Sequence, residues 1–141
     1  MINKWHNWLG MRKHTKYWYK KDLADELAEY YQETTIIHKW SELSDVVYVF
    51  TRAKWNGYDI DFPFNRWQFL LGLIYMLPKY SDRFIFFKMA GRRAEAKKDL
   101  HEVRNPRRIR KLDHIAKKYE IDPSKFKAIC EKQLKYWPLL P

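Results

Sequence analysis

Four carboxylates in the first third of the chain occur as two pairs with the same spacing. Glu26 and Glu29 are three residues apart, as are Glu42 and Asp45, and twelve residues separate the pairs. Side chains three residues apart share one face of a helix, so each pair would form a small acidic cluster. The twelve intervening residues allow the chain to reverse and bring the clusters together. Four convergent carboxylates would make an oxygen-rich site for Mg²⁺, which Mn²⁺ would also fit.

The charge of the chain is strongly segregated around these carboxylates. Residues 22–45 contain seven acidic residues and one base, Lys39, although the whole chain has a net charge of +11. From residue 83 to the end there are 17 bases and seven acids. A basic protein with a pI near 9.7 is expected to meet an anionic partner such as a nucleotide, a nucleic acid or a membrane surface.

Helices are the elements that must position these groups. Apolar residues recur at helical spacing on both acidic segments, and a run that is apolar nearly all round follows them. Asn-Pro and Asp-Pro pairs each predict a helix start in the last third. The pattern predicts a short helix within residues 1–14 and further helices over about 15–33, 37–56, 65–77 (ended by Pro78), 81–91, 106–119 and 123–136.

We therefore predict one all-α domain over residues 1–141, because no segment favours a strand. It would contain an acidic metal-binding helix pair (20–57), apolar central helices (64–91) and a basic helical hairpin with a docked tail (105–141). The longest apolar run, 67–77, is about half the length needed to span a bilayer. One cysteine and the lack of a signal-peptide pattern favour a cytoplasmic, reducing compartment.

The segments LADELAEYYQ and HKWSELSDVVYVF resemble the MazG-like all-α nucleotide pyrophosphohydrolases, over roughly residues 20–60. The family pattern is E-x-x-E followed by E-x-x-D. The resemblance implies that Glu26, Glu29, Glu42 and Asp45 are catalytic metal ligands for Mg²⁺. It also implies cleavage of a nucleoside triphosphate between its α- and β-phosphates, and a homo-oligomer. The twelve-residue gap is at the short end of the family range, and the chain beyond Gly57 departs from the pattern.

Bases close to the acidic pairs are the candidates for binding the phosphates of such a substrate. Lys39 precedes Glu42 by one helical turn, and Arg52 and Lys54 follow Asp45 on the same predicted helix. Two other interpretations of the acidic segment remain open. It can be a solvated acidic face, or it can form salt bridges with the basic last third.

Residues 112–131 resemble helix-turn-helix DNA-binding units, with small Ala116 where two helices would cross and Glu120 at the turn position that glycine often holds. The alternative function is therefore nucleic-acid binding by the basic hairpin, with the acidic pair purely structural. A plain helical hairpin with a basic outer face fits the same periodicity. The candidate nucleic-acid contacts are Arg107, Arg108, Arg110, Lys111, Lys125 and Lys127.

Overall fold

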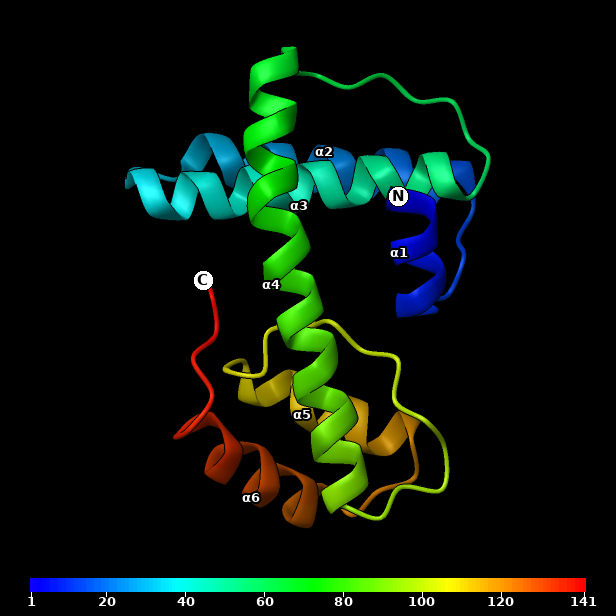
Figure 1. Cartoon of the computed structure of the whole chain (residues 1–141), viewed down its shortest axis with the longest axis vertical. Coiled ribbons are helices and arrows are strands. Elements are labelled where there is room, and N and C mark those ends of the chain that lie inside the picture. Colours follow the sequence, from blue (N-terminus) through cyan, green and yellow to red (C-terminus); the bar gives the residue numbers. More distant parts are fainter. The chain divides into compact units, whose positions relative to one another are not determined.

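The computed structural model describes all of residues 1–141 and contains helices but no strand, which confirms the all-α prediction. Figure 1 shows the six helices in sequence colours. Their bounds are α1 (Ile2–Leu9), α2 (Lys16–Gln32), α3 (Ile36–Trp55), α4 (Arg66–Arg93), α5 (Ile109–Lys118) and α6 (Pro123–Leu134).

The chain divides into two compact units, so the prediction of one domain stays a prediction. The N-terminal unit comprises Met1–Lys79 with Pro141, and the C-terminal unit comprises Tyr80–Leu140. Helix α4 supplies residues to both units. No helix is both long enough and apolar enough to cross a membrane.

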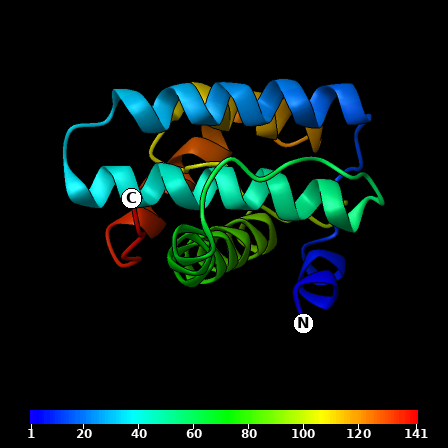
Figure 2. The ribbon, with the colours of Figure 1, turned by 90° about the horizontal axis from the view of Figure 1, so that it is seen from above.

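Helices α2 and α3 form an antiparallel hairpin, seen side by side in Figure 2. Each begins at a threonine whose hydroxyl accepts a hydrogen bond from a backbone N–H one turn later: Thr15 from Trp18 and Thr35 from His38. Thr34 and Thr35 form the short turn between them. The two helices share an apolar core that includes Tyr19, Leu23, Val46, Val49 and Ala53.

Helix α4 differs from the predicted pair of shorter helices, because it continues through Pro78. A proline removes the hydrogen bond to the carbonyl four residues earlier, here that of Ile74. Ile74 and Pro78 are both exposed, so this turn of the helix faces solvent. The residue after the proline, Lys79, is anchored on α3, which holds the helix together at this point. The predicted helix start at Ser81 is therefore wrong.

Helix α4 crosses α3 at Gly72. A Cβ atom built at Gly72 would lie 2.5 Å from Cγ2 of Val47 and 3.1 Å from the backbone oxygen of Leu43. A glycine is needed here because the backbone of one helix lies directly against the other. Next to the crossing, the Trp40 indole donates a hydrogen bond to the backbone oxygen of Leu71 (2.7 Å).

In the C-terminal unit, α5 and α6 pack on each other and on the second half of α4 around an apolar core. Helix α5 begins at Ile109 and not at the predicted residue 106. The Asn105 side chain accepts a hydrogen bond from the Arg107 N–H (3.0 Å), so the Asn-Pro pair starts a turn that precedes the helix. At α6 the predicted cap is confirmed, since Asp122 accepts from the Lys125 N–H (3.0 Å).

The tail docks as expected for the sequence WPLLP. Its Trp137 indole donates to the Asp82 carboxylate (2.6 Å), and the backbone oxygen of buried Leu139 accepts from Arg107 (3.1 Å). Within the N-terminal unit, the backbone oxygen of Pro141 accepts from the Ser41 hydroxyl (2.7 Å).

Candidate metal centre

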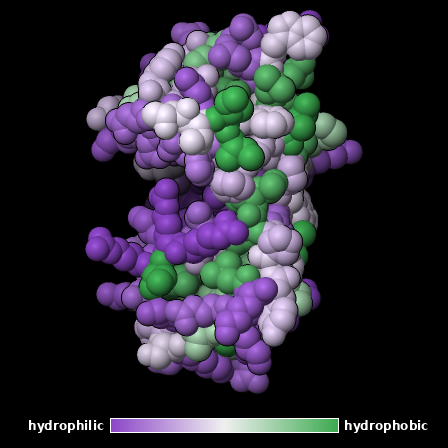
Figure 3. All heavy atoms as spheres, turned by 90° about the vertical axis from the view of Figure 1, so that its left-hand side faces the viewer, coloured by the Kyte–Doolittle hydropathy of each residue, from purple (hydrophilic) through white to green (hydrophobic).

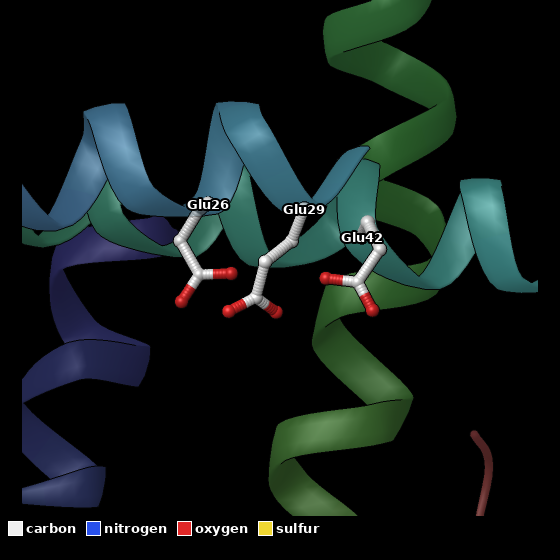
Figure 4. A group of neighbouring side chains, drawn as sticks. All are labelled: Glu26, Glu29 and Glu42. Carbon is white, nitrogen blue, oxygen red and sulfur yellow. The ribbon is translucent and has the colours of Figure 1, made fainter. Parts of the chain in front are cut away.

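Three glutamates of the α2–α3 hairpin lie together. Glu26 and Glu29 are one turn apart on α2, and Glu42 comes from the facing part of α3. Their side chains project to the same side of the hairpin and end near one another (Figure 4). One carboxylate oxygen from each lies within 4.8 Å of the others. The hairpin therefore brings together three of the four carboxylates predicted as metal ligands.

The electrostatics of the cluster reflect burial and mutual repulsion. Glu26 and Glu42 are half-buried, and Glu29 is exposed. Burial, followed by the nearby charges of Asp45 and Glu29, raises the pKa of Glu26 to about 8. Burial is also the main cause that raises the pKa of Glu42, and Asp45 adds to it while Lys79 opposes it. A cation placed among these groups would offset the cost of burying the two carboxylates and their repulsion by neighbouring carboxylates.

One oxygen of the Glu42 carboxylate lacks a hydrogen-bond partner. Its Oε2 atom is buried and accepts no hydrogen bond. A buried carboxylate oxygen without a partner is costly, because it has lost its water without gaining a protein donor. A metal ion is one way to satisfy this oxygen.

The fourth predicted ligand, Asp45, lies beside the cluster but is not one of the three grouped carboxylates. Its Oδ1 atom accepts from the ammonium group of Lys79 on α4, at 2.6 Å. Lys79 is only 1% exposed. It also donates to the backbone oxygen and hydroxyl of Ser41 (3.2 and 2.9 Å) and to the hydroxyl of Ser44 (3.3 Å).

Lys79 is not among the site residues predicted from the sequence. A signal was available: Ser44 and Asp45 follow Ser41 by three and four residues, which places these polar side chains together on a helix that also carries apolar Leu43, Val46 and Val47. Such a buried polar stripe requires a donor from another element. Lys79 is the single basic residue between Arg66 and Arg83, so it was the nearest source of that donor along the apolar helix.

The predicted phosphate-binding bases all have protein partners. Lys39 is half-buried, with its ammonium 5.1 Å from the centre of the Tyr30 ring. Lys54 forms an ion pair with Asp59. Arg52 is buried and donates to the backbone oxygen of Arg12 (2.6 Å). Of the three, Lys39 lies on the same helix face as Glu42, one turn before it.

Arg52 has a structural role in the interior of the N-terminal unit. Its guanidinium lies 5.6 Å from the Trp18 ring, 5.7 Å from the Tyr19 ring and 5.4 Å from the Tyr48 ring. Its charge helps to lower the pKa of buried His6 to about 4, second to the effect of burial, so this ring is neutral at physiological pH. His6 in turn bonds the Thr51 hydroxyl (2.9 Å), which ties α1 to α3.

The basic helical pair buries the apolar positions on which its prediction was based, including Ile115, Ala116 and Phe126. Glu120, in the turn between α5 and α6, has a positive φ of 57°. It thus adopts the left-handed conformation that usually favours glycine at this place. The candidate contacts Arg107, Arg108, Arg110, Lys111 and Lys125 are exposed, and Lys127 is half-buried.

Comparisons with protein families, with curated proteins and with solved structures found no match to this chain. Function must therefore be inferred from the chemistry of the chain's own residues.

Proposed function

We propose that the protein is a Mg²⁺-dependent nucleoside triphosphate pyrophosphohydrolase that cleaves between the α- and β-phosphates. The observation that carries the proposal is the convergence of Glu26, Glu29 and Glu42 from two helices to within 4.8 Å. All the donors are hard carboxylate oxygens, which suit Mg²⁺ or Mn²⁺. Two oxygens on opposite sides of Mg²⁺ are about 4.2 Å apart, so the carboxylate oxygens of the three glutamates lie close to the spacing of ligands that share one ion.

The carboxylates and Lys39 would have different roles in this reaction. Glu26, Glu29 and Glu42 would hold the ion, and Glu42 would thereby satisfy its buried Oε2 atom. The bound ion would contact phosphate oxygens and neutralise the charge that develops on them. Asp45, fixed by Lys79, would orient the attacking water and accept a proton from it. Lys39 is the candidate for binding a substrate phosphate.

Turnover is the direct test. Full-length protein is incubated with Mg²⁺ or Mn²⁺ and a panel of ribonucleoside and deoxyribonucleoside triphosphates, and release of pyrophosphate and monophosphate is measured. We expect turnover of at least one substrate and a loss of orders of magnitude in Asp45→Asn. Asp25→Asn is the matched control, because this exposed carboxylate lies on α2 outside the cluster. Absence of turnover across the panel with both ions would refute the proposal.

The alternative is that the C-terminal helical pair binds nucleic acid. The turn between its helices is consistent with a helix-turn-helix unit, because Glu120 adopts the left-handed conformation that glycine often has at the end of a helix. The exposed bases from Arg107 to Lys111 supply positive charge for phosphates. The test compares duplexes of different sequence before and after Lys125→Ala with Lys127→Ala. Equal affinity for all duplexes in both proteins would remove the groove-reading interpretation.

A further inference from the structure

A cavity of about 460 Å³ lies on α6 in the C-terminal unit. It is lined by Arg93, Ile129, Lys132 and Tyr136, none of which belongs to the carboxylate cluster. Small-molecule sites commonly have volumes of roughly 300–1,000 Å³, so this cavity is of ligand size. Figure 3 shows hydrophilic side chains beside hydrophobic ones over the C-terminal unit, in its lower half.

Three of the lining residues form one face at the end of α6. Ile129, Lys132 and Tyr136 are three and four residues apart, and the Tyr136 N–H bonds the backbone oxygen of Gln133 (3.1 Å), which continues the helical turn beyond Leu134. Tyr136 is 82% exposed. Its neighbour Trp137 is fixed inward by its bond to Asp82 and by a ring contact with Phe86. The Tyr136 ring therefore remains outward beside the cavity.

The fourth lining residue, Arg93, is held in place by a buried side chain. Its Nη1 atom donates to Gln133 Oε1 at 3.0 Å. Gln133 is only 2% exposed, and its Nε2 atom donates to the backbone oxygen of Phe86 (2.8 Å). This chain of hydrogen bonds fixes the guanidinium at the end of α4 before any ligand arrives. A fixed guanidinium plane matches the oxygens of a phosphate group.

The charges and the types of side chain that line the cavity indicate one class of ligand. Both charged residues that line the cavity are cations, Arg93 and Lys132, and Ile129 supplies an apolar surface next to them. An exposed aromatic ring beside two cations is the combination with which proteins bind a nucleobase and its phosphate: the ring stacks on the base, and the cations meet the phosphate.

We propose that this cavity binds a nucleotide unit, with its base stacked on Tyr136 and its phosphate on Arg93 and Lys132. The unit is either a free mononucleotide or a nucleotide within a single strand, since both have the same base and phosphate. The inference is independent of the carboxylate site, and no residue is shared between the two.

The test uses full-length protein, with adenosine monophosphate and a short single-stranded oligothymidylate as probes. Affinity is measured by calorimetry for the first and fluorescence anisotropy for the second. Tyr136→Ala should weaken binding roughly ten-fold, whereas Tyr136→Phe keeps the aromatic face and should bind like the wild type. For the strand, Lys132→Ala should reduce the slope of log affinity against log salt by roughly 0.7. Tyr17→Ala and Lys97→Ala are controls, because both residues are exposed and lie outside the cavity.

Each outcome either supports the inference or overturns it. Loss of mononucleotide binding in Tyr136→Ala supports a small-molecule site, and loss of strand binding alone supports a single-strand site. The inference is overturned if neither probe binds at millimolar concentration, or if Tyr136→Ala binds as tightly as Tyr17→Ala. It is also overturned if a duplex binds as well as the strand and no cavity variant differs from Lys97→Ala, because binding would then reflect the basic charge alone.

Discussion

Glu26 is the residue whose ionisation depends most clearly on the folded structure. Its pKa is about 8 in the folded chain against an ordinary value of 4.5. Between these values the unfolded chain releases this proton and the folded chain keeps it, so without metal the free energy of unfolding should fall as pH rises from about 4.5 to 8. Thermal melts in EDTA at several pH values should show this decline, and Glu26→Gln should reduce it.

Asp25→Asn serves as the control for this prediction, because Asp25 is exposed on the same helix. It should keep the wild-type pH dependence. If Glu26→Gln melts with the same pH dependence as the wild type, Glu26 does not carry the burial and repulsion assigned to it.

Glu42 separates a metal site from a solvated acidic face. Its raised pKa and its buried, unpaired Oε2 atom indicate that its charge opposes folding when no cation is present. Glu42→Gln should therefore melt at a higher temperature than the wild type in EDTA at pH 8. It should also lose most of the stabilisation that Mg²⁺ gives the wild type. Saturation to about 100 times the dissociation constant would stabilise the wild type by about 2.7 kcal/mol.

The other interpretations of the acidic segment predict different melts. On a solvated face the substitution would change stability by no more than about 0.5 kcal/mol, with no specific response to Mg²⁺. In a salt-bridged contact it would remove a partner and lower the melting temperature in EDTA. Asp61→Asn is a suitable control, because this exposed carboxylate lies in the loop before α4.

At the scale of the elements, the crossing of α3 and α4 at Gly72 sets the position of Lys79, two turns further along α4. Alanine favours a helix over glycine by about 1 kcal/mol, so Gly72→Ala would stabilise an unconstrained helix. Here the added methyl would lie 2.5 Å from Val47 and 3.1 Å from the Leu43 backbone oxygen. We expect a net loss of about 1–2 kcal/mol from overpacking, measured by chemical denaturation.

Gly91→Ala provides the comparison within the same helix. The three atoms nearest to its added methyl all belong to the Leu100 side chain, the first at 2.8 Å, and a side chain can move aside more easily than a backbone oxygen. It should therefore cost less stability than Gly72→Ala. A Gly72→Ala protein that is more stable than the wild type would show that the helices separate there at little cost.

Local signals in the sequence predicted most of the helices. The apolar spacing predicted helix starts near residues 15 and 37, and the helices begin at Lys16 and Ile36, where Thr15 and Thr35 cap them. The prediction that a helix ends at Pro78 is wrong, because whether a proline ends a helix depends on tertiary contacts such as those of Lys79. The acidic pairs predicted which helix faces would meet. They did not predict that Asp45 would be engaged by a lysine 34 residues away, since that contact is set by how α4 crosses α3.

At the scale of the whole molecule, the two units have opposite electrostatic character around their candidate sites. The α2–α3 hairpin concentrates carboxylates that suit a cation, and the C-terminal unit concentrates bases that suit phosphates. A nucleotide bound to Mg²⁺ combines both kinds of charge. The proposed hydrolase and the proposed nucleotide cavity therefore concern the same class of compound, although each is tested on different residues.

The N-terminal unit also exposes an apolar face that we expect to pair with a second copy of the chain. Trp67, Leu71 and Ile74 lie on one side of α4 and are 75%, 47% and 64% exposed. Neighbouring apolar side chains on a surface are costly in water and commonly mark an interface. Sedimentation velocity at tens of micromolar should show a dimer. Trp67→Lys should shift it toward monomer, whereas Tyr17→Lys, at a 78% exposed aromatic on α2, should not. A wild-type monomer across this range, or equal behaviour of the two variants, would rule out pairing through this face.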